Sequence, residues 1–213
     1  MFYIKILCGF YLNQKNIMSS IINNVTVINL LQDLSIPTDN TSSSLIQMAT
    51  ANSRYLKELK LNVAASLNSQ HLSRKEAYLL ALSIAVNEKN NILITAFEKL
   101  SEKEGATIEE IAETHACASL MSVNNIFYRF RHFMHENEFY NKQPLGLRMG
   151  LMLNPVMGKG LFELMSLVIS AVNGCEKCVS SHEHSVKEQG ATEARIFDSI
   201  KLAAVIKGLC VVI

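Results

Sequence analysis

Residues 73–87, which read SRKEAYLLALSIAVN, are the stretch that decides the fold. Ser73 followed three residues later by Glu76 is a capping box, an arrangement that satisfies free N–H groups at the start of an α-helix. The apolar side chains from Leu79 to Val86 then recur at positions that give the helix a wide buried face. The stretch therefore predicts an α-helix that packs against other helices.

Helical signals of the same kind continue along the rest of the chain. A second helix is expected through Phe97 up to Gly105, and Thr107 with Glu110 forms another capping box. Only 3 prolines and 9 glycines occur in 213 residues, and alternating strand patterns are scarce. The predicted fold class is all-α, a helical bundle. Further helices are expected over residues 111–121, 124–139, 160–171, 175–189 and 192–209.

Two short matches indicate an internal duplication. Ala85-Val86-Asn87 matches Ala171-Val172-Asn173 at an offset of 86 residues, and Gly105 matches Gly190 at an offset of 85. Both matches fall at corresponding places in the helical pattern. We therefore expect two copies of a three-helix unit, over about residues 73–121 and 160–209.

The N-terminal part of the chain carries weaker signals. Residues 1–50 are interpreted as a poorly defined extension, and residues 51–213 as the helical domain, with a polar linker over residues 37–44. The apolar start lacks the basic region and the small-residue cleavage site of a signal peptide, and Met18 is a second possible translation start. No stretch approaches the ~18 apolar residues that a membrane span requires.

Composition excludes several classes of protein. Hydrophobic residues make up 49% and charged residues 18% of the chain, which is typical of a globular protein. A net charge of +1 with scattered basic residues gives no reason to expect nucleic acid or a membrane surface as a partner. The 5 cysteines include one closely spaced pair, which does not fit a secreted disulfide framework and favours a cytoplasmic protein.

The closely spaced pair is Cys175 and Cys178. It follows Asn173-Gly174, two residues that tolerate the backbone conformation used at helix ends, so Cys175 is expected at the start of the next helix. Side chains three residues apart on a helix have Cβ atoms ~5–6 Å apart, close enough for a disulfide after a small adjustment. The helix N-terminus and the charge of Lys177 favour the thiolate, which attacks peroxides and disulfides.

Two further side chains are expected to join the cysteines. His182 lies seven residues after Cys175 and therefore almost in line with it on a helix, where it can take and return the thiol proton. Glu163 lies among apolar residues of the preceding helix, and a buried carboxylate needs a partner, so it is a candidate proton relay. The candidate catalytic residues are Glu163, Cys175, Cys178 and His182.

The first copy of the duplicated unit is a control for these residues. At an offset of 86, the four candidates correspond to Ala77, Lys89, Ile92 and Ala96. If packing alone required the candidates, the first copy should carry similar side chains. It does not, which favours a chemical role for the second copy.

Other interpretations of the pair exist. Zinc could be bound with His182 as third ligand and His184 or Glu163 as fourth, in a helical interaction module. Structural zinc sites usually combine two ligand pairs, however, and only one pair is present, so no metal is expected. Cys8, Cys117 and Cys210 are interpreted as passive residues.

Several motifs, occurring in order, resemble the alkyl hydroperoxidase AhpD family. The resemblance covers about residues 50–209. The wider superfamily is all-helical and includes carboxymuconolactone decarboxylases, many of which lack the dithiol, so a non-redox enzyme is the alternative. The motifs are Asn124-Asn125-Ile126-Phe127-Tyr128-Arg129, Leu145-Gly146-Leu147-Arg148-Met149, Asn154-Pro155, Phe162-Glu163-Leu164, and the run from Ile169 through Cys175 to His182-Glu183-His184.

The resemblance implies a role for each candidate residue. Cys178 would attack the peroxide, pass through a sulfenic acid and form the mixed disulfide with a partner protein. Cys175 would be the resolving cysteine and proton donor, and Glu163 with His182 would relay protons. Some members have a histidine where this chain has Lys177. The first ~50 residues also exceed the usual N-terminus of the family.

The resemblance also implies a function and partners. The protein would be an antioxidant thiol-dependent peroxidase that reduces organic hydroperoxides and regenerates an AhpC-type peroxiredoxin. Electrons would come from dihydrolipoamide on a lipoylated subunit of a dehydrogenase complex, with no cofactor bound to the chain itself. A homotrimer would be expected.

Overall fold

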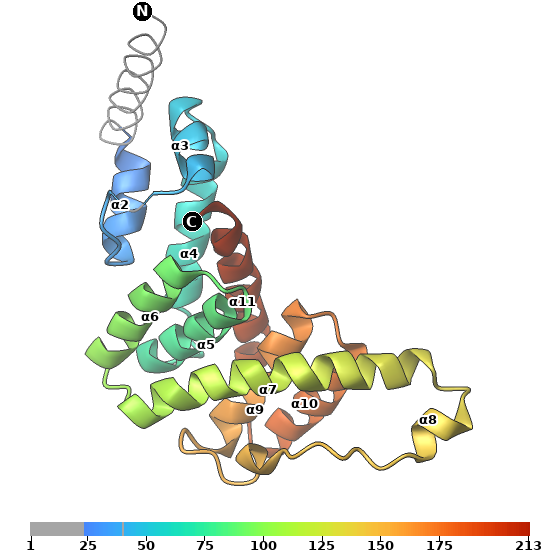
Figure 1. Cartoon of the computed structure of the whole chain (residues 1–213). Coiled ribbons are helices and arrows are strands. Elements are labelled where there is room, and N and C mark those ends of the chain that lie inside the picture. Colours follow the sequence, from blue (N-terminus) through green and yellow to red (C-terminus); the bar gives the residue numbers. More distant parts are fainter. Residues whose placement is uncertain (1–23, 40) are drawn as a thin grey trace, which may run out of the picture.

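The computed structural model describes residues 24–213 except residue 40, and the described residues form helices and no strand. The predicted all-α class is therefore confirmed. The predictions about Met18, Cys8 and the apolar start lie outside the described residues. Figure 1 shows the helices, which are α2 (Val25–Asp33), α3 (Ser43–Thr50), α4 (Tyr55–Leu67), α5 (Arg74–Asn87), α6 (Asn91–Lys103), α7 (Ile108–Phe133), α8 (Glu138–Lys142), the 3-10 helix η1 (Gly150–Met152), α9 (Lys159–Val172), α10 (Glu176–Glu188) and α11 (Glu193–Val212).

Both predicted capping boxes are present at helix starts. The Ser73 side chain accepts from the Glu76 backbone at the start of α5, and Thr107 does the same with Glu110 at the start of α7. The helices predicted over residues 111–121 and 124–139, by contrast, are largely one element. Helix α7 runs unbroken for 26 residues, because no glycine or proline lies between the two predicted segments.

The duplication is visible as two sets of three helices. Helices α9, α10 and α11 each begin 85 residues after α5, α6 and α7 respectively. The turns repeat as well: Lys89 and Gly174 have φ of 59° and 68°, and Gly105 and Gly190 have φ of 86° and 84°. The structural offset is therefore 85 throughout. The Ala-Val-Asn match at 86 is one residue out of the structural register.

Helices α5 and α9 form the centre of the core. Their side chains are buried over almost the whole length, from Ala77 to Ala85 and from Leu161 to Ser170. The two helices pack against each other, α7 packs against both, and α10 packs on α9. Figure 1 shows α7 crossing α9 and α10 and carrying α8 at its far end. This arrangement places the turn between α9 and α10 beside the C-terminal half of α7.

The core also includes the N-terminal helices α2 and α3. Val27, Leu30 and Leu31 of α2 and Leu45 of α3 are fully buried in the same cluster as the central helices. The side chain of Ser42, within the predicted linker, caps α3 and donates to the backbone carbonyl of Val212 at the other end of the chain. The core therefore continues across the predicted boundary. Within the part of the chain that is described, no helix is long and apolar enough to cross a membrane.

A pair of asparagine side chains joins the ends of the two central helices. Asn87 donates to Oδ1 of Asn173 at 2.9 Å, and Asn173 donates back to Oδ1 of Asn87 at 3.1 Å.

We expect Asn87→Ala to lower the free energy of unfolding by about 1–2 kcal/mol, because it leaves the Asn173 amide without this partner. Urea unfolding measures the change, and Gln47→Ala at an exposed amide is the control, expected within about 0.5 kcal/mol of the parent. Purely additive costs of Asn87→Ala and Asn173→Ala would contradict the pairing.

Candidate active site

The turn between α9 and α10 places the two cysteines. The backbone N–H of Gly174 bonds to the carbonyl of Ala171, and that of Cys175 bonds to Ser170, both at 3.1 Å. This closure requires the positive φ of Gly174, a conformation that glycine adopts without strain. Cys175 is then the N-cap of α10, as the sequence predicts.

A polar network between helices holds this turn in place. Arg129 of α7 donates to the backbone carbonyl of Asn173 at 2.6 Å, and Asn173 donates to Asn125 Oδ1 at 2.9 Å. Asn125 in turn donates to Ser170 Oγ at 2.8 Å. The sequence analysis missed this function of Asn125 and Arg129. A buried asparagine within a helix was the available signal, because such a side chain needs polar partners.

Cys175 and Cys178 are joined by a disulfide in this structure, with their Cα atoms 5.3 Å apart. Cys175 is fully buried, whereas Cys178 is 5% exposed and lines a cavity of about 210 Å³. Of the two cysteines, Cys178 is therefore the one that a small molecule in the cavity could reach.

The carboxylate of Glu163 is paired with two basic side chains, His182 and Lys159. Its Oε2 is 2.7 Å from His182 Nδ1, and its Oε1 is 2.8 Å from the ammonium group of Lys159, one turn earlier on α9. Burial acts to raise the pKa of Glu163, but the hydrogen bonds and charges of His182 and Lys159 outweigh it and lower the pKa below its ordinary value of 4.5. The carboxylate is therefore ionised at neutral pH and can accept a hydrogen bond from an N–H group at Nδ1 of His182.

Lys159 is a member of the site that the sequence analysis missed. Its Nζ also donates to the backbone carbonyl of Met152 at 2.6 Å, so it connects α9 to the segment that precedes it. The spacing of Lys159 and Glu163, four residues apart on a helix, was the available signal. A second buried carboxylate, Glu113 of α7, accepts from the backbone N–H groups of residues 156 and 157 at 2.7 and 2.8 Å. Together these bonds fix the connection that covers the cavity.

The cavity has two chemically different sides. On one side, helix α10 contributes the polar residues Lys177 and Ser181 together with Cys178 and His182. The connection before α9 contributes two methionines, whose flexible thioethers adapt to apolar molecules of different shape. The lining residues are Asn124, Tyr128, Met149, Met152, Lys177, Cys178, Ser181 and His182.

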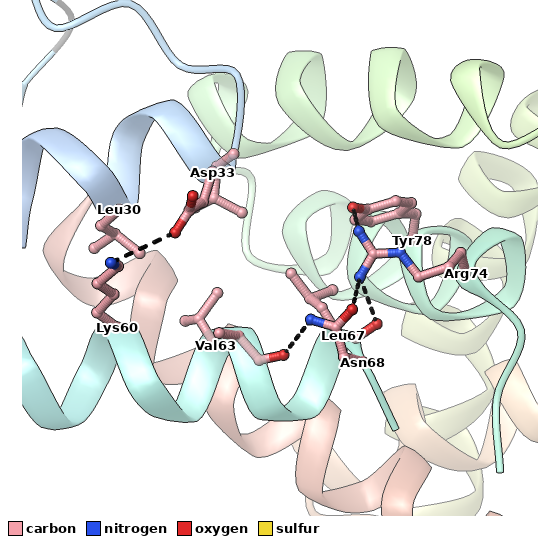
Figure 2. Close-up of a pocket in the computed structure, with 10 residues that line it drawn as sticks. Leu30, Asp33, Lys60, Val63, Leu67, Asn68, Arg74 and Tyr78 are labelled. Carbon is pink, nitrogen blue, oxygen red and sulfur yellow. Dashed lines mark hydrogen bonds and ion pairs between the residues drawn. The ribbon is translucent and has the colours of Figure 1, made fainter. Parts of the chain in front are cut away.

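The first three-helix unit shows what this position looks like without the candidate residues. With the offset of 85, Glu163 and His182 correspond to Tyr78 and Phe97, whose ring centroids are 6.4 Å apart. Lys159 corresponds to Arg74, which bonds to the Tyr78 hydroxyl (Figure 2). The same contacts between helices are thus made by an aromatic pair. The cysteines correspond to Asn90 and Leu93.

The sequence-based control used an offset of 86, so its four counterpart residues are wrong. Its conclusion stands with the corrected ones, because none of them is a cysteine, a histidine or a carboxylate. The folded unit therefore packs without the four candidate side chains.

Cys117, Cys210 and His184 do not line the cavity. Burial raises the pKa of Cys117 and of Cys210 to about 12, so neither forms a thiolate readily. His184 is exposed and lies 3.3 Å from Glu188. Among the described residues, no group of three or more histidine, cysteine or acidic side chains is arranged to hold a metal ion.

Comparison with known proteins identifies relatives over most of the chain. Residues 140–212 match the carboxymuconolactone decarboxylase family. Alkyl hydroperoxide reductase AhpD of Coxiella burnetii is 38% identical over 160 residues, which are 73% of this chain and 88% of the relative. The AhpD proteins of Anaeromyxobacter dehalogenans and of a Bradyrhizobium species are 36% and 35% identical, over 73% and 75% of this chain and 82% and 87% of theirs. Similarity of this extent, together with a dithiol at the start of α10, shows that the chain belongs to the alkyl hydroperoxide reductase AhpD family.

Proposed function

We propose that this protein reduces organic hydroperoxides, and the disulfide of a partner peroxiredoxin, through the dithiol of Cys175 and Cys178. The observation that carries the proposal is the position of Cys178. Its sulfur lies at the start of a helix, beside a cavity that His182 also lines, and Glu163 binds that histidine on its other side. The start of a helix favours the thiolate form of a cysteine. A histidine held by a carboxylate can accept the proton of the thiol and pass it on.

The proposed reaction proceeds in two steps within the chain. The Cys178 thiolate attacks the terminal oxygen of the hydroperoxide, so an S–O bond forms, the O–O bond breaks, and the alcohol leaves after it gains a proton. Cys178 is now a sulfenic acid. The Cys175 thiol then attacks the Cys178 sulfur, which forms the disulfide and releases water.

Reduction of the disulfide closes the cycle. Dihydrolipoamide supplies two electrons and two protons by thiol–disulfide exchange and becomes the cyclic disulfide. With a partner peroxiredoxin, Cys178 would instead attack the partner's disulfide and form a mixed disulfide, which Cys175 resolves. Lys177 lines the cavity next to Cys178 and supplies positive charge where some family members have a histidine.

We also propose that the chain forms a homotrimer through the far end of α7 and the segment after it. Exposed apolar side chains gather on these elements, including Ile126, Phe133, Phe139 and Leu153. Figure 1 shows that α8 and the following connection project from the rest of the bundle. Exposed apolar side chains in such numbers on neighbouring elements support an interaction site there.

Turnover of cumene hydroperoxide with dihydrolipoamide as the only reductant tests the proposal. We expect consumption of both substrates in equal amounts, with a thiol count that falls by two per chain after peroxide treatment and recovers with dithiothreitol. A thiol count that neither reagent changes would favour the non-redox alternative, an enzyme of the decarboxylase type. One tightly held zinc ion per chain would favour an interaction module and would contradict the redox proposal.

Trapping of the partner tests the order of the two cysteines. We expect Cys175→Ser to accumulate a mixed disulfide with an AhpC-type peroxiredoxin, because Cys178 can still attack but nothing resolves the product. Non-reducing electrophoresis detects the complex, and the Cys175→Ser, Cys178→Ser double variant is the control. A complex that forms instead with Cys178→Ser would reverse the assigned order.

A further inference from the structure

The side chain of Asn124 is a buried amide that lacks a protein partner. It lies on α7, is 3% exposed and lines the cavity in front of Cys178. Its Oδ1 has no hydrogen-bond partner within the described structure, and its Nδ2 is 3.9 Å from the sulfur of Met152, a weak acceptor. A strong hydrogen-bonding group is therefore held at the wall of the cavity without a strong bond to the protein.

The neighbouring residue shows that this helix can satisfy a buried amide. Asn125 accepts a hydrogen bond from Asn173 and donates one to Ser170, so both ends of its amide are used. An unsatisfied buried polar group costs about 1–3 kcal/mol, and an apolar side chain of the same shape would avoid that cost. A role in folding therefore explains Asn125 but leaves Asn124 unexplained.

We propose that Asn124 binds the O–O–H group of the hydroperoxide, with Oδ1 accepting the hydrogen bond of the terminal hydroxyl. This inference rests on the proposed function and adds a substrate-binding residue to it. The hydroxyl oxygen is the atom that the Cys178 thiolate attacks, and its hydrogen stays on that oxygen when the sulfenic acid forms. Asn124 thus holds the reacting oxygen while the alcohol departs.

The rest of the cavity fits the other part of such a molecule. A hydroperoxide has one hydroxyl donor at one end and an organic group at the other. Met149 and Met152 offer apolar contacts to the organic group, while Asn124 and His182 contribute polar groups to the same lining. The disulfide of a lipoyl group or of a peroxiredoxin has no hydroxyl donor at the reacting sulfurs. Oδ1 of Asn124 therefore distinguishes peroxide from disulfide substrates.

Asn124→Leu, which keeps the shape and removes the amide, tests the inference in single-turnover reactions of the reduced, full-length protein. We expect its rate with cumene hydroperoxide and with hydrogen peroxide to fall by the same factor of about 10, the size of one lost hydrogen bond. Its rate with an aromatic disulfide such as dithiobisnitrobenzoate should equal that of the parent. Gln47→Ala, at an exposed amide on α3 that does not line the cavity, is the control and should keep the parental rate with all three substrates.

The outcomes separate the inference from the function on which it rests. Unchanged hydroperoxide rates in Asn124→Leu would overturn the inference and leave the proposed function in place. Equal losses with hydroperoxide and disulfide would also overturn it, because Asn124 would then act on the thiolate. A parent protein that reduces disulfides but no hydroperoxide would overturn the proposed function itself.

Urea unfolding gives a separate check. The free energy of unfolding of Asn124→Leu should equal or exceed that of the parent, and a clear decrease would assign Asn124 to folding. If Asn124→Leu does not fold, Asn124→Ala takes its place in the rate measurements.

Discussion

Cys178→Ser is expected to lower the rate of hydroperoxide reduction with dihydrolipoamide by a factor of about 10³ or more. The serine hydroxyl is not ionised at neutral pH and does not attack the O–O bond, so the first step has no nucleophile. Cys175 does not substitute for it, because that residue is fully buried and does not line the cavity. Coupled consumption of cumene hydroperoxide and dihydrolipoamide measures the effect.

Cys210→Ser is the matched control for this substitution. Cys210 lies on α11, and burial raises its pKa to about 12, so its loss should leave turnover unchanged. Full activity in Cys178→Ser would remove the proposed mechanism altogether. Loss of activity in both variants would show that the effect is not specific to Cys178, and it would remove the support for Cys178 as the nucleophile.

Glu163→Gln is expected to slow the same reaction by about a hundredfold, the lower end of what a proton-transfer group contributes. The amide still reaches His182 and Lys159, but it has no charge to stabilise a protonated histidine during proton transfer. The disulfide between Cys175 and Cys178 should still form under oxidation, since neither cysteine is changed. Tyr78→Phe, at the corresponding position of the first three-helix unit, is the matched control and should keep the parental rate. Equal rates for Glu163→Gln and the parent would contradict a proton relay.

The same substitution is expected to change how stability depends on pH. The pKa of Glu163 is lower in the folded protein than its ordinary value of 4.5, so the unfolded chain binds this proton more readily. The stabilisation from the ionised carboxylate is therefore complete above about pH 4.5 and is lost as the pH falls through the lower, folded pKa. We expect the difference in unfolding free energy between parent and Glu163→Gln to be largest near neutral pH and to shrink below about pH 4. A difference that stays constant from pH 7 to pH 3.5 in urea unfolding would contradict the assigned shift.

Local signals in the sequence predict much of the site because they act over a few residues. Ser73 with Glu76 and Thr107 with Glu110 fix two helix starts through bonds inside one turn. Asn173-Gly174 fixes the start of α10 in the same way, and with it the spacing of the cysteines. Such signals do not fix the offset between two distant helices, which is why the Ala-Val-Asn match suggested 86 residues where the folded units have 85.

The sequence by itself determined that this protein is helical, where a dithiol would lie, and which family it resembles. The proposed roles of Glu163, Cys175, Cys178 and His182 stay predictions that the experiments above test. Tertiary structure alone decided that His182 Nδ1 lies 2.7 Å from Glu163, and that Lys159 binds the other carboxylate oxygen. It also placed Asn124 and the methionines around the cavity. The reason is physical: helix starts depend on hydrogen bonds between near neighbours, whereas the walls of a cavity depend on how helices from the whole chain pack into one core.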